Sequence, residues 1–346
     1  MTKDPSTSSF YQLTADRVID AVETAMQKEK PGIRATGRAL ALNSLENRVY
    51  EIEFEDNSYV VSKFYRPFRW SAAQIIEEHE FLLHLHGLEI PVVAPRALSE
   101  SKHSKLQNKA GTLAQSAEGI YFAIFPKVRG RLCDELSTDQ LRTLGRYLGR
   151  IHSVGKTWNF KHRLRLTSEK WGWESLDYLL ESPFMDAAMS SRYEQVAEDL
   201  MDVIGDLVDT APSGSIHGDC HVGNVLWEGD APFFLDFDDA CRGPAAQDIW
   251  MMIRGRGEEA EKQRAELLMG YEQMCEWNPN SLSLIEPLRG LRIMHYSAWV
   301  ARRWDDPSFP RAFPEFGSPS YWRSEIEALM EIADLCSGGG TFQNDE

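Results

Sequence analysis

Cysteine is scarce in this sequence, and the few cysteines present do not form a metal or disulfide pattern. The 346 residues contain five cysteines, an odd number with no C-x-x-C pair, so neither a disulfide framework nor a zinc site is indicated. The first residues lack an apolar segment, and no apolar run approaches the length that spans a membrane. We therefore expect a cytoplasmic protein with no membrane partner.

Basic residues are also in short supply. The chain has 37 lysines and arginines against 53 aspartates and glutamates, which gives a formal net charge of -16. Because such a chain repels a phosphate backbone, we expect no nucleic-acid partner, whereas ATP needs only one local basic pocket. A hydrophobic content of 42% and ten tryptophans exclude a disordered chain, and the length is sufficient for two lobes.

The most informative part of the chain combines two acidic motifs. His217, Asp219 and Asn224 form the pattern H-x-D-x-x-x-x-N, and Asp236 begins a D-x-D pattern a short turn later. Apolar runs between the two motifs predict two strands joined by a turn, which would place Asn224 and Asp236 on neighbouring strand ends. This combination is typical of the catalytic loop and metal-binding acid of a kinase-like phosphotransferase.

These residue types suit phosphoryl transfer. Asp219 is the candidate base for an acceptor hydroxyl. Asn224 and Asp236 are candidate magnesium ligands, because magnesium takes oxygen donors and bridges phosphate oxygens. We assign Asp236 as a catalytic residue together with Asp219. An isolated loop aspartate commonly caps a turn, but the spacing to Asn224 and the strands that follow favour the catalytic interpretation. We expect His217 to brace the loop by hydrogen bonding.

Three more aspartates follow the motif. Either Asp238 or Asp239 could bind a second metal ion or pair with a nearby arginine, and the sequence leaves both roles open. Asp248 stands at the start of a predicted helix, where a carboxylate needs no catalytic role. It could also accept hydrogen bonds from the backbone of the catalytic loop and hold that loop rigid.

A lysine upstream is the candidate phosphate-binding cation. Lys63 lies in a β run and is predicted to hold the α- and β-phosphates of the nucleotide, although a lone strand lysine is usually just solvated. On a helical wheel of the next segment, Glu78 lies near the apolar face, while Glu77 and Glu80 fall on the far side. An inward carboxylate needs a cationic partner, so we expect Glu78 to pair with Lys63.

No glycine-rich G-x-G-x-x-G motif precedes Lys63. In its place, the segment 42–50 is rich in small polar groups where the first two strands should turn. Its backbone N–H groups and the hydroxyl of Ser44 could cover phosphates. An ordinary hairpin turn explains the local sequence nearly as well, but the position just before the lysine strand favours the phosphate-binding interpretation.

Periodicity divides the chain into a β-rich first part and a helical second part. We expect helices at 14–26 and 71–86, strands between residues 40 and 64, and later helices at 138–152, 245–256, 258–276, 284–304 and 320–336. This pattern predicts an α+β, bilobal, protein-kinase-like fold with a small β-rich N-terminal lobe and a large helical C-terminal lobe. Its parts are a nucleotide-binding lobe at 1–125, a hinge at 126–131, a helical lobe at 132–336 and a flexible tail at 337–346. Pro126 and Val128 of the hinge are assigned to the nucleotide site.

Together these residues resemble the aminoglycoside phosphotransferase/choline kinase branch of kinase-like folds. The segments 42–50, 63–67, 217–224, 236–240 and 295–307 more closely resemble the bacterial stress response kinase A (RdoA-type) family, in order and across nearly the whole chain. The resemblance implies an ATP- and magnesium-dependent kinase that phosphorylates serine or threonine of proteins and is linked to envelope stress. It also implies that Asp219 is the acid/base, that Asn224 and Asp236 bind magnesium, and that Ser44 belongs to the phosphate loop.

The sequence departs from ordinary protein kinases near the catalytic loop. Gly218 stands where the H-R-D motif has arginine, and Asp238 replaces the glycine of D-F-G. Eleven residues separate Asp236 from Asp248, too few for a long regulatory activation segment. We therefore expect no control by loop phosphorylation, and we expect the C-terminal helices to select the acceptor.

Three functions were weighed. The leading one is a serine/threonine protein kinase that acts as a monomer on a protein acceptor or on itself. The alternative is a small-molecule kinase on the same fold that phosphorylates an amino alcohol, a sugar or an aminoglycoside. A non-catalytic nucleotide-binding adaptor is disfavoured, because it has no need of the whole set Lys63, Glu78, Asp219, Asn224 and Asp236.

Overall fold

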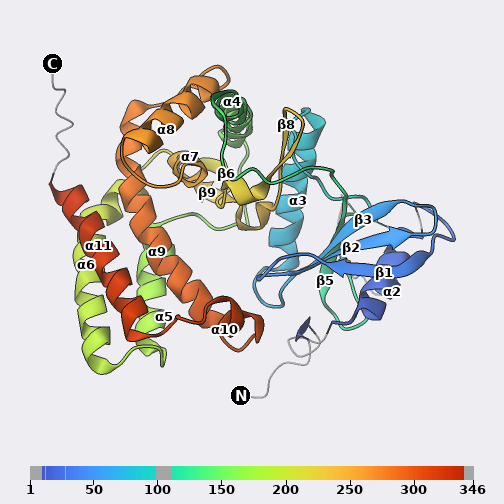
Figure 1. Ribbon diagram of the computed structural model, residues 1–346, viewed down its shortest axis with the longest axis horizontal. Helices are drawn as coiled ribbons and strands as arrows, with labels where there is room; N and C mark the ends of the chain where they lie inside the picture. The colour runs from blue at the N-terminus through green and yellow to red at the C-terminus, as the bar shows by residue number, and fades with distance from the viewer. Residues whose placement is uncertain (1–9, 12, 28, 99–110, 339–346) are drawn as a thin grey trace.

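A small sheet and a larger helical body make up the structure. The computed structural model describes residues 10–11, 13–27, 29–98 and 111–338, so residues 339–346 of the predicted tail lie outside it. Figure 1 shows the sheet with α2 (Ala15–Met26) on one side and the helical body on the other, with α3 (Ala72–Gly87) between them. The predicted α+β, bilobal, kinase-like fold is confirmed. Among the helices described, none has the length and apolar character needed to cross a membrane.

The sheet is antiparallel, with strand order β1-β2-β3-β5-β4. Its strands are β1 (Ala35–Ala41), β2 (Arg48–Phe54), β3 (Tyr59–Phe64), β4 (Ala114–Gln115) and β5 (Tyr121–Pro126). Side chains alternate between the two faces. Ile52 and Phe54 of β2 pack with α2 (Ala15–Met26) in one apolar cluster. Lys63 of β3 is paired with Val49 and therefore lies on the opposite face.

Both predicted N-terminal helices are present and begin at polar caps. The Oγ1 of Thr14 accepts the N–H of Arg17 at 3.5 Å at the start of α2. Ser71 and Gln74 form a reciprocal capping box at the start of α3, in which each side chain accepts the backbone N–H of the other residue. Phe81 of α3 packs into the core of the helical body, so this helix connects that body to the sheet.

The helical body contains more helices than sequence periodicity singles out. Its helices are α4 (Thr138–Gly155), α5 (Glu174–Glu181), α6 (Ala187–Asp209), α7 (Ala246–Met252), α8 (Glu258–Tyr271), α9 (Ile285–Arg302), α10 (Ser308–Ala312) and α11 (Pro319–Ser337). The predictions match α4, α8, α9 and α11, but they make α7 too long and omit α5, α6 and α10. Helix α11 lies along α6, as Figure 1 shows.

Two short strand pairs carry the central motif. β6 (Gly214–Ile216) pairs with β9 (Cys241–Gly243), and β7 (Val225–Glu228) forms a hairpin with β8 (Ala231–Phe234). The predicted strand–turn–strand is therefore confirmed. The segment after β5 reaches this hairpin, because Arg131 and Trp227 exchange both backbone hydrogen bonds, at 3.0 and 2.9 Å.

Helices α4 and α8 approach each other so closely that their contact requires glycine. A Cβ atom built on Gly145 of α4 would lie 1.9 Å from the carbonyl oxygen of Leu267 in α8. Gly270 of α8 is equally restricted, at 2.0 Å from the carbonyl oxygen of Arg142. The two backbones therefore touch directly, and no side chain larger than hydrogen fits between them.

We predict that Gly145→Ala destabilises the protein by about 2–3 kcal/mol, because overpacking forces the helices apart. The measurement is the free energy of unfolding in urea. Gly205→Ala in α6 is the matched control, since its Cβ would have no neighbour nearer than 3.6 Å. That control should be neutral or stabilising by up to about 1 kcal/mol, because alanine favours helix more than glycine does. Equal effects of the two variants would contradict the close contact.

Candidate active site

The catalytic loop is held by a buried carboxylate from α7. Asp248 accepts the N–H of His217 at 2.8 Å through Oδ2 and the N–H of Gly218 at 2.9 Å through Oδ1. The ring of His152 in α4 lies 2.9 Å from the same Oδ2 atom. Asp248 is fully buried, so these partners satisfy a charge that would otherwise be costly. The loop-bracing role considered for Asp248 is therefore seen in the structure.

Gly218 has a conformation that other residues avoid. Its φ is +85°, and a Cβ at this position would lie 2.2 Å from the carbonyl oxygen of Asp239. An arginine cannot stand here without moving that backbone. The departure from H-R-D thus has a steric cause, namely the tight contact between the catalytic loop and the turn that follows β8.

His217 braces the loop, as expected. Its Nε2 atom lies 2.8 Å from the carbonyl oxygen of Leu235, and its Nδ1 atom accepts the N–H of Asp219 at 3.3 Å. A carbonyl oxygen can only accept, so Nε2 is the donor in the first contact and Nδ1 is the acceptor in the second. The ring also packs on Phe237, with centroids 4.3 Å apart. His217 therefore ties the catalytic loop to the end of β8.

Asn224 and Asp236 lie at neighbouring ends of the hairpin. The side-chain amide of Asn224 donates to the carbonyl oxygen of Asp219 at 2.9 Å, and the backbone carbonyl of Asn224 accepts the N–H of Leu235 at 2.9 Å. Asp236 follows directly in the left-handed region, with φ 55° and ψ 63°. Non-glycine residues rarely adopt this conformation, and it often marks functional sites.

The predicted phosphate-binding lysine reaches this hairpin. The Nζ atom of Lys63 lies 2.7 Å from Oδ1 of Asp236 and 3.1 Å from Oδ1 of Asp238. Burial alone would lower the pKa of Lys63, but the two carboxylates raise that pKa well above its ordinary value. The lysine therefore stays charged and joins the sheet to the catalytic hairpin.

The predicted Lys63–Glu78 pair is not the pair that the structure shows. Glu78 is buried as expected, at 1% exposure, but its nearest ion-pair partner in the described chain is Arg163, at 3.8 Å. Lys63 pairs instead with Asp236 and Asp238, which approach it more closely. Burial raises the pKa of Glu78 to about 7, with Lys63 and Arg163 acting in the opposite direction.

The prediction that Glu77 faces away from the core is wrong. Glu77 is 8% exposed, and its carboxylate accepts the backbone N–H groups of Lys161, His162 and Arg163. The helical wheel located the apolar stripe of α3 but could not show that the loop at 161–163 covers the adjoining side. Glu77 therefore fastens this loop to α3.

Asp238 and Asp239 pair with an arginine. The guanidinium of Arg69 lies 2.6 Å from Oδ2 of Asp238 and 2.5 Å from Oδ1 of Asp239. The side-chain amide of Asn47 donates to Asp238 at 3.2 Å. The guanidinium of Arg163 donates to the carbonyl oxygens of Phe237, Asp238 and Ala240. These hydrogen bonds stabilise the turn that contains both aspartates. No sequence pattern singles out Arg69 or Arg163. Asn47 belongs to the segment 42–50, which is predicted to cover phosphates, but its contact with Asp238 does not follow from the sequence.

The segment that joins β1 to β2 folds back on the helical body. Ser44 accepts the N–H of Asn47 at 3.4 Å, an ordinary turn contact, so its role toward phosphate stays a prediction. Glu46 accepts the indole N–H of Trp299 at 2.6 Å and pairs with Arg303 at 2.5 Å. A second link is formed by Asp306, which pairs with both Arg48 and Arg66 at 2.9 Å.

Asp219 also has an arginine partner. The Nη2 atom of Arg292 in α9 lies 2.6 Å from Oδ1 of Asp219, and the Nε2 atom of His221 lies 3.6 Å from Oδ2. Burial would raise the pKa of Asp219, but Arg292 and His221 lower it, and the net result is a pKa well below the ordinary value. The carboxylate is therefore ionised at neutral pH.

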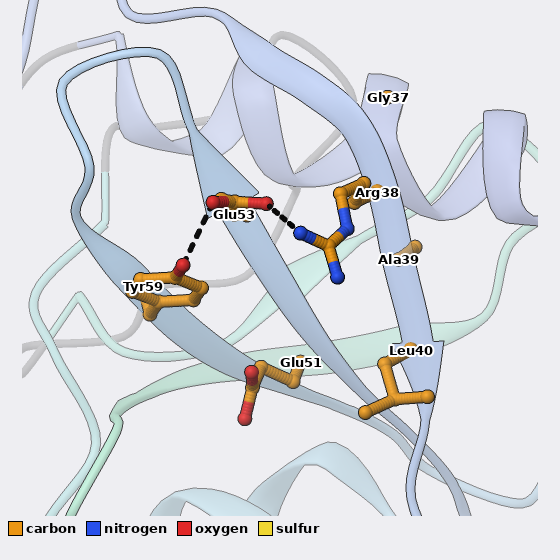
Figure 2. A pocket seen from close by; sticks show the side chains of 7 residues that line it. All are labelled: Gly37, Arg38, Ala39, Leu40, Glu51, Glu53 and Tyr59. Atoms are coloured by element: carbon orange, nitrogen blue, oxygen red, sulfur yellow. Dashed lines mark hydrogen bonds and ion pairs between the residues drawn. The ribbon is translucent and has the colours of Figure 1, made fainter.

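A groove of about 300 Å³ lies on the sheet face that carries Lys63. Figure 2 shows Glu53 between Tyr59, whose hydroxyl donates at 2.7 Å, and Arg38, which pairs at 3.1 Å. Lys127, between the predicted nucleotide residues Pro126 and Val128, pairs with Glu51 of the groove at 2.8 Å. The nucleotide role of Pro126 and Val128 stays a prediction.

We predict that Glu78→Gln changes how stability depends on pH. The folded pKa of Glu78, about 7, exceeds its ordinary value of 4.5, so the wild type loses stability as pH rises between these values, while the Gln variant does not. The stability of the variant relative to wild type should therefore rise by roughly 1 kcal/mol or more between about pH 5 and 8. Urea unfolding of both proteins tests this, with Glu80→Gln on the exposed side of α3 as control. A difference independent of pH would refute the prediction.

Several known proteins are similar to this chain in sequence. The model of a family described as the phosphotransferase enzyme family matches residues 38–285. Stress response kinase A of Escherichia coli (strain K12) is 36% identical over 331 residues, which cover 95% of this chain and 95% of that protein. Serine/threonine protein kinase RdoA of Salmonella typhimurium (strain LT2) is 35% identical over 324 residues, with 93% of each chain covered.

Solved structures show the same architecture at lower identity. Amicoumacin kinase hAmiN, in complex with AMP-PNP, Ca2+ and Ami, has a TM-score of 0.67 and 21% identity, with 87% of this chain and 89% of that chain covered. A microcompartment-associated aminopropanol kinase has a TM-score of 0.62 and 16% identity, with 94% and 97% covered. At these identities the likeness shows the fold alone. The chain therefore belongs to the phosphotransferase enzyme family and, within it, to the stress response kinase A (RdoA-type) group.

Proposed function

We propose that this phosphotransferase moves the γ-phosphate of ATP to a serine or threonine hydroxyl of a protein. The proposal rests mainly on the ion pair between Lys63 and Asp236, whose atoms lie 2.7 Å apart. Asn224 and Asp219 of the catalytic loop lie next to this pair. Such a set provides a cation for phosphates, oxygen ligands for a metal ion and a carboxylate for the acceptor hydroxyl. The relatives named stress response kinase A suggest that the reaction serves a stress response.

Asp219 acts as the proposed catalytic base. Its carboxylate is ionised, and the hydrogen bonds from Asn224 to its carbonyl oxygen and from its N–H to His217 fix its backbone. Its low pKa makes it a weak proton acceptor, so its main contribution is to orient the acceptor hydroxyl and to take the proton late. Asp248 supports this geometry by holding the preceding two N–H groups.

The residues present fit a magnesium ion that arrives with the nucleotide. Asn224 and Asp236 offer oxygen ligands, and the described residues contain no group of three His, Cys, Asp or Glu that could hold a metal by itself. The remaining ligands would therefore come from phosphate oxygens and water, as magnesium prefers. When bound, the ion neutralises charge on the phosphates. Lys63 would then exchange part of its contact with Asp236 for the phosphates.

The nature of the acceptor separates two candidate functions. A protein acceptor is supported by the RdoA relative, which is named a serine/threonine protein kinase and is 35% identical. Solved structures with small-molecule acceptors in their titles support the alternative, an amino alcohol, sugar or aminoglycoside kinase, but they are 16–21% identical. The higher identity favours the protein acceptor or the chain itself.

We predict that Asp219→Asn lowers phosphoryl transfer by about 100- to 10,000-fold, the usual loss for a removed general base. Transfer of labelled phosphate from ATP would be measured with a protein acceptor, with the protein alone, and with aminopropanol or spectinomycin. Asp230→Asn, in the exposed turn between β7 and β8, is the matched control and should keep full activity. Full activity in Asp219→Asn would disprove the base assignment. Labelling of the small molecules alone would favour the alternative function.

We predict that Asp236→Ala abolishes transfer but leaves the fold intact. Its side chain is 48% exposed, so its removal creates no buried cavity, and Lys63 keeps its contact with Asp238. Activity should also vanish when magnesium is removed from the wild type with EDTA and return when it is added back. Thermal unfolding checks the fold of the variant. Normal activity and unchanged magnesium dependence in Asp236→Ala would show that another group holds the metal.

A further inference from the structure

Arg292 forms an ion pair with Asp219, the carboxylate that the acceptor hydroxyl must approach. Its guanidinium lies 2.6 Å from Oδ1 of Asp219, while Oδ2 faces His221 at 3.6 Å. An acceptor hydroxyl has to come within roughly 2.6–3.2 Å of this carboxylate to transfer its proton. A hydroxyl can approach Oδ2 while Arg292 stays in place, whereas an approach to Oδ1 requires Arg292 to move.

The other arginines on this side of α9 have partners outside the reaction. Arg303 pairs with Glu46 at 2.5 Å, and Arg302 donates to the carbonyl oxygen of Glu174 at 3.0 Å. For Arg292, the side-chain partner seen in the described chain is Asp219 itself. Only 23% of its side chain is exposed, so an Arg292 displaced from Asp219 needs another anion.

Several arginines lie near Arg292 although the whole chain is acidic. His295 lies one turn further along α9, stacked on Trp171 with ring centroids 4.7 Å apart, and its buried Nδ1 atom has no hydrogen-bond partner. Burial first, and then Arg292, Arg302, Arg69 and Arg303, lower the pKa of His295 to about 3. Asp239 also interacts with Arg292, but its carboxylate is already paired with Arg69 at 2.5 Å, so it is not a free anion for a displaced Arg292.

We propose that Arg292 determines acceptor specificity by moving from Asp219 to a carboxylate next to the acceptor hydroxyl. The preferred acceptor is then a serine or threonine flanked by aspartate or glutamate. In the reaction, the hydroxyl oxygen bonds to the γ-phosphorus, its proton passes to Asp219, and the bond to the bridging oxygen breaks to release ADP. The proposal rests on the proposed protein kinase function and adds the sequence class of its acceptor.

The test compares serine peptides that are identical except for aspartate or asparagine beside the serine, or one residue further on either side. For wild type, kcat/KM should be higher for an aspartate peptide than for its asparagine partner. Arg292→Gln should erase this preference, with a loss of about 10- to 100-fold on the aspartate peptide, the usual worth of a hydrogen bond to a charged group. The loss on the asparagine peptide measures the effect of removing the contact with Asp219 by itself, so the decisive quantity is the ratio of the two kcat/KM values.

Arg289→Gln is the matched control, because it removes the same charge one turn earlier on α9. Arg289 is similarly exposed, at 20%, and contacts Glu286 rather than Asp219. This control should keep the preference, and Arg292→Lys should keep part of it. Thermal unfolding of each variant excludes loss of the fold.

Two outcomes overturn the proposal while leaving the kinase function intact. These are transfer by wild type with no preference for aspartate peptides, and a preference that survives in Arg292→Gln. If wild type labels small molecules but no peptide, the protein kinase function itself fails and this proposal falls with it.

Discussion

The ion pairs that join Lys63 to Asp236 and Asp238 are the interaction on which the rest of the site depends. Lys63 and Asp238 are buried and each would be unfavourable alone, because burial penalises both charges, while Asp236 is half exposed. Together they are mutually satisfied, and Arg69 and Asn47 complete the shell around Asp238. The sheet and the catalytic hairpin must therefore meet at this point, although more than a hundred and seventy residues separate Lys63 from Asp236.

Around that cluster, the catalytic loop is positioned through its backbone. Asp248 takes two consecutive N–H groups, His217 bridges to the end of β8, and Gly218 lets the loop touch the following turn. These contacts leave the side chain of Asp219 with Arg292 and His221 as partners. The backbone of Asp219 is thus held by hydrogen bonds that do not use its carboxylate oxygens. One of those oxygens, Oδ1, pairs with the guanidinium of Arg292.

The parts of the site that sequence alone predicts are those encoded locally. The hairpin that carries Asn224 and Asp236, the caps of α2 and α3, and the inward position of Glu78 all follow from spacing and periodicity within short segments. Burial on the other side of α3 could not be predicted, because Glu77 is covered by a loop from a distant part of the chain.

The sequence also does not predict which buried charged side chains form ion pairs with one another. Three carboxylates compete for Lys63, and the separation of atoms in the folded chain decides between them. The role of Arg69 and the pairing of Arg292 with Asp219 were not predictable for the same reason, since an arginine in a helix or turn carries no local mark of its distant partner. Helices α5 and α6 also escaped the periodicity analysis, although both bury apolar side chains in the helical body.

The paired arginines on Asp306 have a consequence for how the sheet is held against the helical body. Asp306 is 1% exposed and holds Arg48 at the start of β2 and Arg66 after β3. Separating the sheet from the helical body at this point would break both ion pairs at once and expose the three charges to water. One buried carboxylate after α9 thus opposes the opening of the molecule on two strands of the sheet together.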